Sequence, residues 1–414
     1  MKIVLMHPTG NQFVRALLQS LNKEELLIEF ETAIAMNSNS TWIKYLPNEM
    51  RQECLRRSYD ISPEKIWTHG LLETARLILP KMKLNKYVNH EHGFASTYSV
   101  YKNFDKAAAK RLAKIAHKNK VNAVYAYEDG ALTTFKQAKE LGIKCIYDLP
   151  IAYWETGRKL LTEEAARLPK WAKTLGGGIL DSQEKLERKT QEMEMADVVI
   201  VPGEFVMSSI PKWAQGKKII MAPFGSPLIK NNEQTHKKTT STPLRVLFAG
   251  SMGQRKGLGD LFAALKLINR KDIELIVMGS LLESMEFYRS EYPNFIYEPG
   301  RPHDAVLALM QSCDVFCLPS IIEGRALVMQ EAMSQGLPLI ITRNTGGEDL
   351  IIEGETGFLV PIRSPEAIAE KLNWFLENRS KVAEMGEMAR THAARYTWKN
   401  YGSTIIDSLR EYMI

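Results

Sequence analysis

The chain of 414 residues is 45% hydrophobic and 25% charged, with a formal net charge of +6. This composition is typical of a globular protein of two or three domains, and the mild basic excess fits either an anionic partner or a generic solvated surface. It argues against a membrane-spanning protein and a disulfide scaffold, because no apolar run reaches about 18 residues and only four cysteines are present.

The first half of the chain predicts a sheet of parallel strands. Residues 2–6 indicate a buried strand rather than a signal peptide, since no cleavage pattern follows, so we expect a cytoplasmic protein. Apolar runs then alternate with amphipathic stretches, as in strand–helix–strand units, and residues 37–103 are expected to form an insertion on the sheet. Further strands are expected at residues 123–127, 144–147, 198–201 and 218–221, and helices at residues 104–117 and 131–141.

The second half repeats this organisation after a polar segment. Residues 229–243 are expected to be a linker between a first domain, residues 1–228, and a second domain, residues 244–395. Residues 396–414 are expected to form a helix that packs back on the first domain. Strands are expected at residues 244–250, 274–278, 295–297, 315–318 and 337–341, and helices at residues 365–377 and 380–392. The sequence thus predicts an α/β protein of two doubly wound, Rossmann-like domains.

Ligands of such sheets bind beyond the carboxyl ends of the strands, so the cleft between two facing domains is the expected site. The loop after residues 244–250 contains Gly250, Ser251, Arg255 and Lys256. Glycine lets the backbone approach a phosphate closely, and the two cations would stabilise a diphosphate. Taken alone, this loop is equally consistent with a plain turn.

The loop after residues 315–318 carries two carboxylates, Glu323 and Glu331. Both could face the cleft, where a carboxylate can accept hydrogen bonds from two adjacent sugar hydroxyls. The N–H groups at the helix start would point at a diphosphate. These amides belong to Arg325, Ala326, Leu327 and Val328. The structural alternative is that Glu323 caps the helix and Glu331 is a solvated helix residue.

A third loop contains Gly346 and Gly347, which would let the backbone pass close to a donor sugar or would simply form a turn. Together the three loops resemble the family 4 retaining glycosyltransferases of the GT-B fold, the glycosyl transferases of group 1. The resemblance covers residues 244–358, where the motifs follow one another in the order and spacing of the family. They are Glu323-x7-Glu331, residues 313–320, Glu331-Ala332-Met333-x2-Gly336-x-Pro338, Gly346-Gly347 and residues 354–361.

The resemblance implies transfer of a sugar from a UDP- or GDP-sugar to a hydroxyl of a glycan or glycolipid, with retention of anomeric configuration. In such enzymes Glu331 corresponds to the ribose-binding glutamate, Glu323 to the carboxylate near the donor sugar, and Lys256 to the cation at the diphosphate. Ser251 stands where the family often has arginine. Arg255 is therefore expected to supply the missing charge.

The first half resembles the family only in outline. Gly10 sits where the family places a glycine loop under the donor phosphate. Many relatives have a histidine after the strand that matches residues 144–147, whereas this sequence has Asp148. Asp148 could bond a sugar hydroxyl in place of that histidine, as part of the catalytic machinery, or it could serve the structure alone.

Three residues at other strand ends, Glu128, Asp129 and His7, are candidates for contact with the acceptor. A carboxylate there could orient an acceptor hydroxyl or accept its proton, although Asp129 could instead cap the following helix. His90 and His92, with lysines nearby, suit an anionic or lipid-linked acceptor or a solvated surface. A peripheral contact at the inner face of a membrane is the corresponding hypothesis.

We expect no cofactor, no nucleic-acid partner and no metal. Cys313 and Cys317 lie in one apolar run without a second ligand pair, and the sequence has no Asp-x-Asp pair to hold a metal against a diphosphate. Two alternatives to sugar transfer remain open. One is a nucleotide-sugar 2-epimerase, and the other is a non-catalytic nucleotide-sugar-binding protein, for which the departures at Ser251 and Asp148 leave room.

Overall fold

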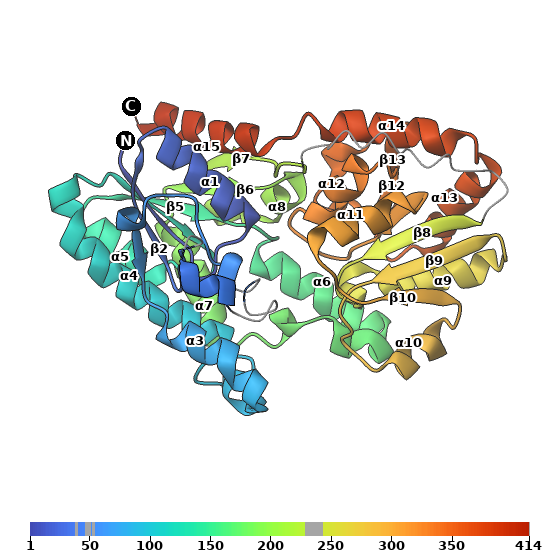
Figure 1. Cartoon of the computed structure of the whole chain (residues 1–414), viewed down its shortest axis with the longest axis horizontal. Coiled ribbons are helices and arrows are strands. Elements are labelled where there is room, and N and C mark those ends of the chain that lie inside the picture. Colours follow the sequence, from blue (N-terminus) through green and yellow to red (C-terminus); the bar gives the residue numbers. More distant parts are fainter. Residues whose placement is uncertain (38–39, 46–50, 52–53, 228–242, 414) are drawn as a thin grey trace.

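The computed structural model describes residues 1–37, 40–45, 51, 54–227 and 243–413, and these form two lobes (Figure 1). Of the expected linker, residues 229–242 lie outside the described residues. Each lobe is built on a sheet whose paired strands all run parallel. The fold is therefore α/β in both halves, as the sequence predicts.

The first lobe contains a seven-stranded sheet in the order β3-β2-β1-β4-β5-β6-β7. Its strands are β1 (Ile3–Met6), β2 (Leu27–Thr32), β3 (Ile66–Thr68), β4 (Ala123–Tyr127), β5 (Lys144–Asp148), β6 (Val198–Val201) and β7 (Lys218–Met221). β2 does not show as a strand in the sequence, because Glu29 and Glu31 interrupt its apolar pattern. Arg111 donates to Glu29 at 2.6 Å, which compensates the charge on one of these carboxylates.

Helices cover both faces of this sheet. The described helices of this half, together with the last described helix, are α1 (Gln12–Lys23), α3 (Leu71–Ile78), α4 (Thr97–Asn119), α5 (Leu132–Glu140), α6 (Trp154–Arg167), α7 (Gln183–Met195), α8 (Glu204–Ser209) and α15 (Trp398–Met413). Phe104 of α4 packs on one face, while Leu17 of α1 and Ile405 of α15 pack on the other. Figure 1 shows α15 lying beside α1, so the C-terminal helix returns to the first lobe.

The second lobe contains a six-stranded sheet in the order β10-β9-β8-β11-β12-β13. Its strands are β8 (Leu244–Ala249), β9 (Ile273–Met278), β10 (Phe295–Glu298), β11 (Val315–Leu318), β12 (Leu339–Ile341) and β13 (Gly357–Leu359). Its helices are α9 (Leu258–Ile268), α10 (Met285–Glu291), α11 (His303–Gln311), α12 (Leu327–Ser334), α13 (Pro365–Glu377) and α14 (Lys381–Ala393). The strand order reverses between β8 and β11, which is where such sheets bind ligands.

One stretch of residues 1–228 packs on the second lobe rather than the first. Trp171, which follows α6, belongs to the hydrophobic core of the second lobe, where its ring meets Phe262 and Phe287. Arg167 of α6 also donates to Asp260 at 2.7 Å. Figure 1 shows α6 crossing between the lobes. The sequence boundary at residue 228 therefore does not describe the packing, because the pattern of a helix does not say which sheet it covers.

Candidate active site

A cleft with a volume of about 620 Å³ lies between the two lobes. Its wall in the second lobe comes from the loops after β8, β9, β10 and β11, from Val306 of α11 and from α12. Its wall in the first lobe comes from Phe13 of α1, from Pro150 and Ile151 after β5, and from Phe224. The cleft thus lies at the carboxyl ends of the strands, where sheets of this kind bind ligands.

Lys256 and Glu323 meet in this cleft. Lys256 Nζ donates to Glu323 Oε1 at 2.6 Å, and Arg255 Nη1 lies 3.0 Å from the same oxygen. The lysine stem passes over Gly250, where a Cβ atom would lie 2.7 Å from Lys256 Cδ. A larger residue at position 250 would therefore displace the lysine. The two cations expected to hold a diphosphate therefore both contact the Glu323 carboxylate.

Glu331 projects into the same cleft from α12. Its side chain is 17% exposed, and Nδ1 of His303 lies 3.7 Å from its Oε1 atom. Burial raises the pKa of Glu331, and the charge on His303 opposes that rise. The two carboxylates of the Glu323-x7-Glu331 motif therefore share one pocket, although the sequence alone left a solvated Glu331 open.

The start of α12 faces the cleft with its backbone. Residues from Gly324 to Val328 line the cleft. Ala326 N–H donates to Thr345 O at 3.3 Å, whereas the amides of Leu327 and Val328 donate to no backbone carbonyl among the described residues. These two amides sit at the positive end of the helix dipole. They could therefore bind an anion, as the sequence analysis expects.

The side chain of Arg325 turns away from the cleft. It is buried, and its guanidinium donates to both oxygens of Asp349 at 2.6 and 3.0 Å. It also donates to Gly346 O at 3.2 Å. Only the backbone of Arg325 is placed to contact a donor, because the ion pair with Asp349 holds its side chain inside the second lobe.

Ser251, Gly346 and Gly347 are not among the described residues that line the cleft. Gly346 lies behind the Glu323 loop, where a Cβ atom would come within 1.7 Å of Gly324 O. Gly346 therefore packs against the Glu323 loop, and a contact of this glycine pair with a donor sugar stays a prediction. Conversely, Arg301 lines the cleft, and no motif pointed to it.

Asp148 lies inside the first lobe and not in the cleft. It is 2% exposed, and Tyr125 Oη donates to its Oδ2 atom at 2.5 Å. Burial raises the pKa of Asp148 to about 7. Alternation along β5 places Asp148 on the same face as Ile146, which packs in the cluster beneath α1 and α15. Of the two alternatives for Asp148, the structural one fits.

A second pocket, of about 510 Å³, adjoins the cleft through Phe13 and Pro150, which line both. It contains His7, a candidate for contact with the acceptor. His7 Nδ1 accepts hydrogen bonds from Thr9 N at 3.1 Å and Gly10 N at 2.8 Å. Burial lowers the pKa of His7 to about 3, so the ring is neutral and carries its proton on Nε2. Gly10 shapes this loop and lines neither pocket.

Glu128 and Asp129 also line the second pocket. Lys189 Nζ lies 3.3 Å from Glu128 Oε1 and 3.6 Å from Asp129 Oδ2. Burial raises the pKa of Glu128, and the charge of Lys189 opposes the rise. Asp129 does not cap α5, because Glu192 takes that role by accepting from the amides of Asp129, Ala131 and Leu132 at 2.9, 2.9 and 3.1 Å.

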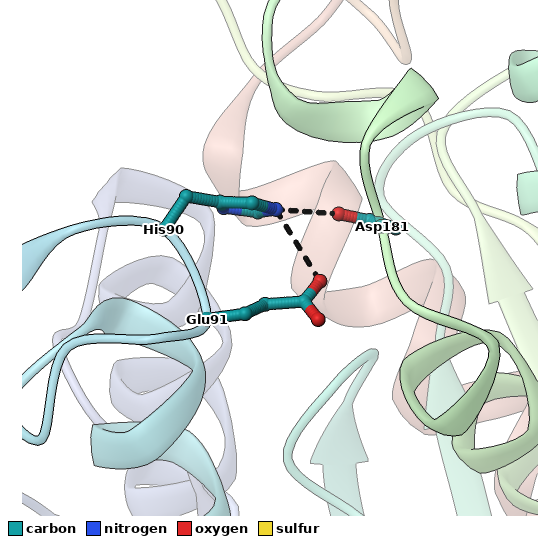
Figure 2. Close-up of side chains that lie close together, drawn as sticks. All are labelled: His90, Glu91 and Asp181. Atoms are coloured by element: carbon teal, nitrogen blue, oxygen red, sulfur yellow. Dashed lines mark hydrogen bonds and ion pairs between the residues drawn. The ribbon is translucent and has the colours of Figure 1, made fainter.

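Three potential metal ligands meet at the edge of the second pocket. Figure 2 shows His90 pointing at both Asp181 and Glu91, with its Nε2 atom 3.0 and 3.3 Å from their oxygens. Lys185 Nζ lies 2.9 Å from the same Asp181 oxygen, and Ser182 N–H donates to Glu91 at 3.2 Å. These carboxylates are therefore satisfied by hydrogen bonds. The cluster holds the loop before α7 against the loop before α4.

The buried cysteines do not assemble a metal site either. Cys145, Cys313 and Cys317 are all buried. Among the described residues, the group of His90, Glu91 and Asp181 is the one set of three candidate ligands close enough to share an ion, and it lies outside the cleft. In the described part of the chain, no helix has the length and apolar content needed to cross a bilayer.

The fold and the cleft together define a two-lobed α/β protein of the GT-B type. Sucrose-phosphate synthase from Thermosynechococcus elongatus superimposes with a TM-score of 0.67 and 15% identity, over 100% of this chain and 99% of that one. Anabaena HepE, solved in complex with UDP, superimposes with a TM-score of 0.63 and 16% identity, over 99% and 100% of the two chains. At these identities the likeness concerns the fold.

Residues 230–392 match the family model of the glycosyl transferases group 1. A D-inositol 3-phosphate glycosyltransferase of Corynebacterium urealyticum is 34% identical over 110 residues. That match covers 27% of this chain and 26% of the relative. The shared segment is therefore about a quarter of the relative's length.

Proposed function

We propose that the chain is a retaining, metal-independent glycosyltransferase that moves a sugar from a UDP- or GDP-sugar to a hydroxyl of a glycan or glycolipid. The observation that carries this proposal is the convergence of Lys256, Glu323 and Glu331 on one cleft between two Rossmann-like lobes. The family match supports the reaction class. HepE, which has the same fold and was solved with UDP, supports testing UDP-sugars first.

In this proposal the donor lies along the wall of the second lobe. The Glu331 carboxylate accepts hydrogen bonds from the two ribose hydroxyls, which it can do at both oxygens. The diphosphate contacts Lys256 and the amides of Leu327 and Val328, so that a cation and a helix start share its charge. Arg301 lines the same cleft and can add a second cation.

The chemistry follows from charge. The bond from the anomeric carbon to the diphosphate oxygen breaks, and Lys256 stabilises the negative charge that develops on the leaving group. The acceptor oxygen bonds the anomeric carbon from the face that the diphosphate vacates, and its proton passes to the leaving phosphate oxygen. Glu323, held by Lys256 and Arg255, remains a carboxylate beside an oxocarbenium-like sugar. This route needs no nucleophile from the protein.

The acceptor is proposed to enter through the second pocket. His7 can donate from Nε2, and Glu128 and Asp129 can accept from hydroxyls. A sugar ring offers both donors and acceptors, so such a mixed lining suits a glycan or the head of a glycolipid. A glycolipid acceptor would bring the first lobe to the inner face of a membrane.

The test begins with donor binding. Thermal unfolding is measured with UDP-, GDP- and ADP-sugars, and one of them is expected to stabilise the protein by about 2.7 kcal/mol at a hundred times its Kd. Glu331→Ala should abolish that shift, whereas Glu370→Ala, at an exposed glutamate of α13, should keep it. An unchanged shift in Glu331→Ala would contradict the proposal.

Activity then separates the alternatives. A transferase hydrolyses the bound donor slowly without acceptor, and NMR of the transfer product should show the anomeric configuration of the donor. Epimerised donor formed in the absence of acceptor would identify an epimerase. Binding without hydrolysis or transfer for any donor would identify a non-catalytic binding protein.

A further inference from the structure

Residues 71–94 form a projection from the first lobe. It consists of α3, the turns η3 (Leu79–Met82) and η4 (Asn85–Val88), and the loop that follows. Figure 1 shows α3 and these turns extending at the lower edge of the lobe. None of the apolar side chains of this projection belongs to the hydrophobic clusters that the described residues form. The apolar surface here is not used to hold the fold together.

The exposed side chains of the projection include large apolar ones. Leu71 is 83% exposed, Met82 62%, Phe94 54%, Ile78 48% and Tyr87 38%. Single exposed apolar residues are ordinary on a protein surface, but several on one short projection mark an interaction site. Their exposure to water is unfavourable, so a partner that covers them would gain free energy of burial.

The charged side chains of residues 74–90, the central part of the projection, are cationic. Lys81, Lys83 and Lys86 are all exposed, and residues 74–90 contain no aspartate or glutamate. Glu73, just before this stretch, is buried, and Arg76 donates to it at 2.6 Å. The exposed face of residues 74–90 therefore carries positive charge without a compensating carboxylate of its own.

We propose that the 71–94 projection docks on an anionic lipid bilayer. Its apolar side chains would enter the boundary between headgroups and acyl chains, while its lysines attract anionic headgroups. An acidic partner in water would pair with the lysines but would leave the apolar side chains exposed. The interface of an anionic bilayer both pairs with the lysines and buries the apolar side chains.

The projection ends beside the second pocket. Its base carries His90, which lines the second pocket and lies 3.0 Å from Asp181 on the opposite loop. Docking would thus place the second pocket beside the lipid headgroups. The inference concerns a surface and is tested without donor or acceptor, so its failure would leave the proposed sugar transfer untouched.

The first test is co-sedimentation of the full chain with vesicles. We expect binding to vesicles of phosphatidylcholine mixed with phosphatidylglycerol and much weaker binding to phosphatidylcholine alone. Replacing Lys81, Lys83 and Lys86 with glutamine should lower binding roughly fivefold for each lysine, on the order of a hundredfold together. Equal binding to both kinds of vesicle, or none to either, would overturn the proposal.

A matched control removes the same charge elsewhere. Lys110, Lys114 and Lys118 are exposed on the C-terminal half of α4, and their triple glutamine variant should bind almost as well as the unmodified chain. An equal loss in this control would show that net charge alone drives binding, which would also overturn the proposal.

A second variant tests the apolar part. Met82→Ser with Phe94→Ser should lower vesicle binding at least tenfold, since these side chains would no longer be buried in the interface. Binding to heparin, a soluble polyanion, should not change. If vesicle binding persists in this variant, or if sedimentation velocity shows that the same two side chains mediate a dimer, the bilayer is not the partner.

Discussion

Lys256 Nζ and Glu323 Oε1 lie 2.6 Å apart on the second-lobe wall of the cleft, so the cation expected at the diphosphate is already paired with the carboxylate expected at the donor sugar. A diphosphate that binds Lys256 must share it with Glu323. Removing the cation and removing its competitor should therefore have opposite effects on the affinity for a nucleotide.

Lys256→Met is expected to weaken UDP or GDP binding about tenfold to a hundredfold, because a hydrogen bond to a charged group contributes roughly 1.5–3 kcal/mol. Glu323→Gln is expected to leave nucleotide affinity unchanged or higher while it lowers turnover, because the lysine is released but the carboxylate is lost. Calorimetry with UDP and GDP measures the affinity. Lys266→Met, at an exposed lysine of α9, is the control, and equal losses of affinity in the Lys256 and Glu323 variants would contradict the prediction.

Gly324 joins the Glu323 loop to the first lobe. A Cβ atom at this position would lie 1.6 Å from Pro150 O, so Gly324→Ala must push the two loops apart. We expect a loss of stability of about 1–3 kcal/mol, as for other overpacked sites, and a fall in turnover as the cleft widens. Gly216→Ala is the control, because a Cβ there meets no atom within 4 Å. Chemical denaturation and turnover check both, and an unchanged Gly324 variant would show that the lobes need not approach so closely.

Asp148 should lower the stability of the folded chain as the pH rises. Its pKa of about 7 in the folded chain lies above the ordinary value of 3.8, so the folded state loses stability as the pH rises through this range. An asparagine in its place would carry no such cost. Urea unfolding measures how much the free energy of unfolding of Asp148→Asn exceeds that of the unmodified chain. This difference should be about 3 kcal/mol larger at pH 8 than at pH 5. Asp148→Asn should retain its turnover. A loss of turnover comparable to that of Lys256→Met would show that Asp148 takes part in catalysis.

His7 should lower the stability of the folded chain as the pH falls. Because burial lowers its pKa from 6.5 to about 3, its contribution is complete above pH 6.5 and is lost as the pH falls. An asparagine oxygen can still accept from the amides of Thr9 and Gly10. Between pH 6.5 and pH 5 the unmodified chain should lose about 2 kcal/mol more stability than His7→Asn. Urea unfolding at several pH values measures this loss. If both proteins lose the same free energy of unfolding between pH 6.5 and pH 5, His7 is not buried in its neutral form.

Much of the fold follows from patterns along the chain. Most of the strands in the described residues are short apolar runs, and the sequence placed all of them except β2, β3 and β13. Glu29 and Glu31 interrupt β2, while β3 and β13 have only three residues each, too few to show a pattern. The Glu323-x7-Glu331 spacing also placed both carboxylates correctly at one strand–helix junction. Such features depend on residues that are close together in the sequence, so one sequence is enough to reveal them.

Other parts of the site required the three-dimensional structure. Asp148 was a candidate for the cleft, yet it is buried inside the first lobe, whereas no motif pointed to Arg301, which lines the cleft. A strand buried on both faces has no polar side, so its pattern does not reveal which way Asp148 points. Arg325 likewise points inward only because Asp349 meets it from another loop.

The succession of strands along the chain and the spacing of the loop residues were thus decided by the sequence itself, because burial selects apolar residues locally and repeatedly. Which lobe receives Trp171, which side chains reach the cleft and how Lys256 pairs with Glu323 were decided only by the tertiary structure. Each of these depends on contacts between segments far apart in the chain, and no local pattern encodes the partner.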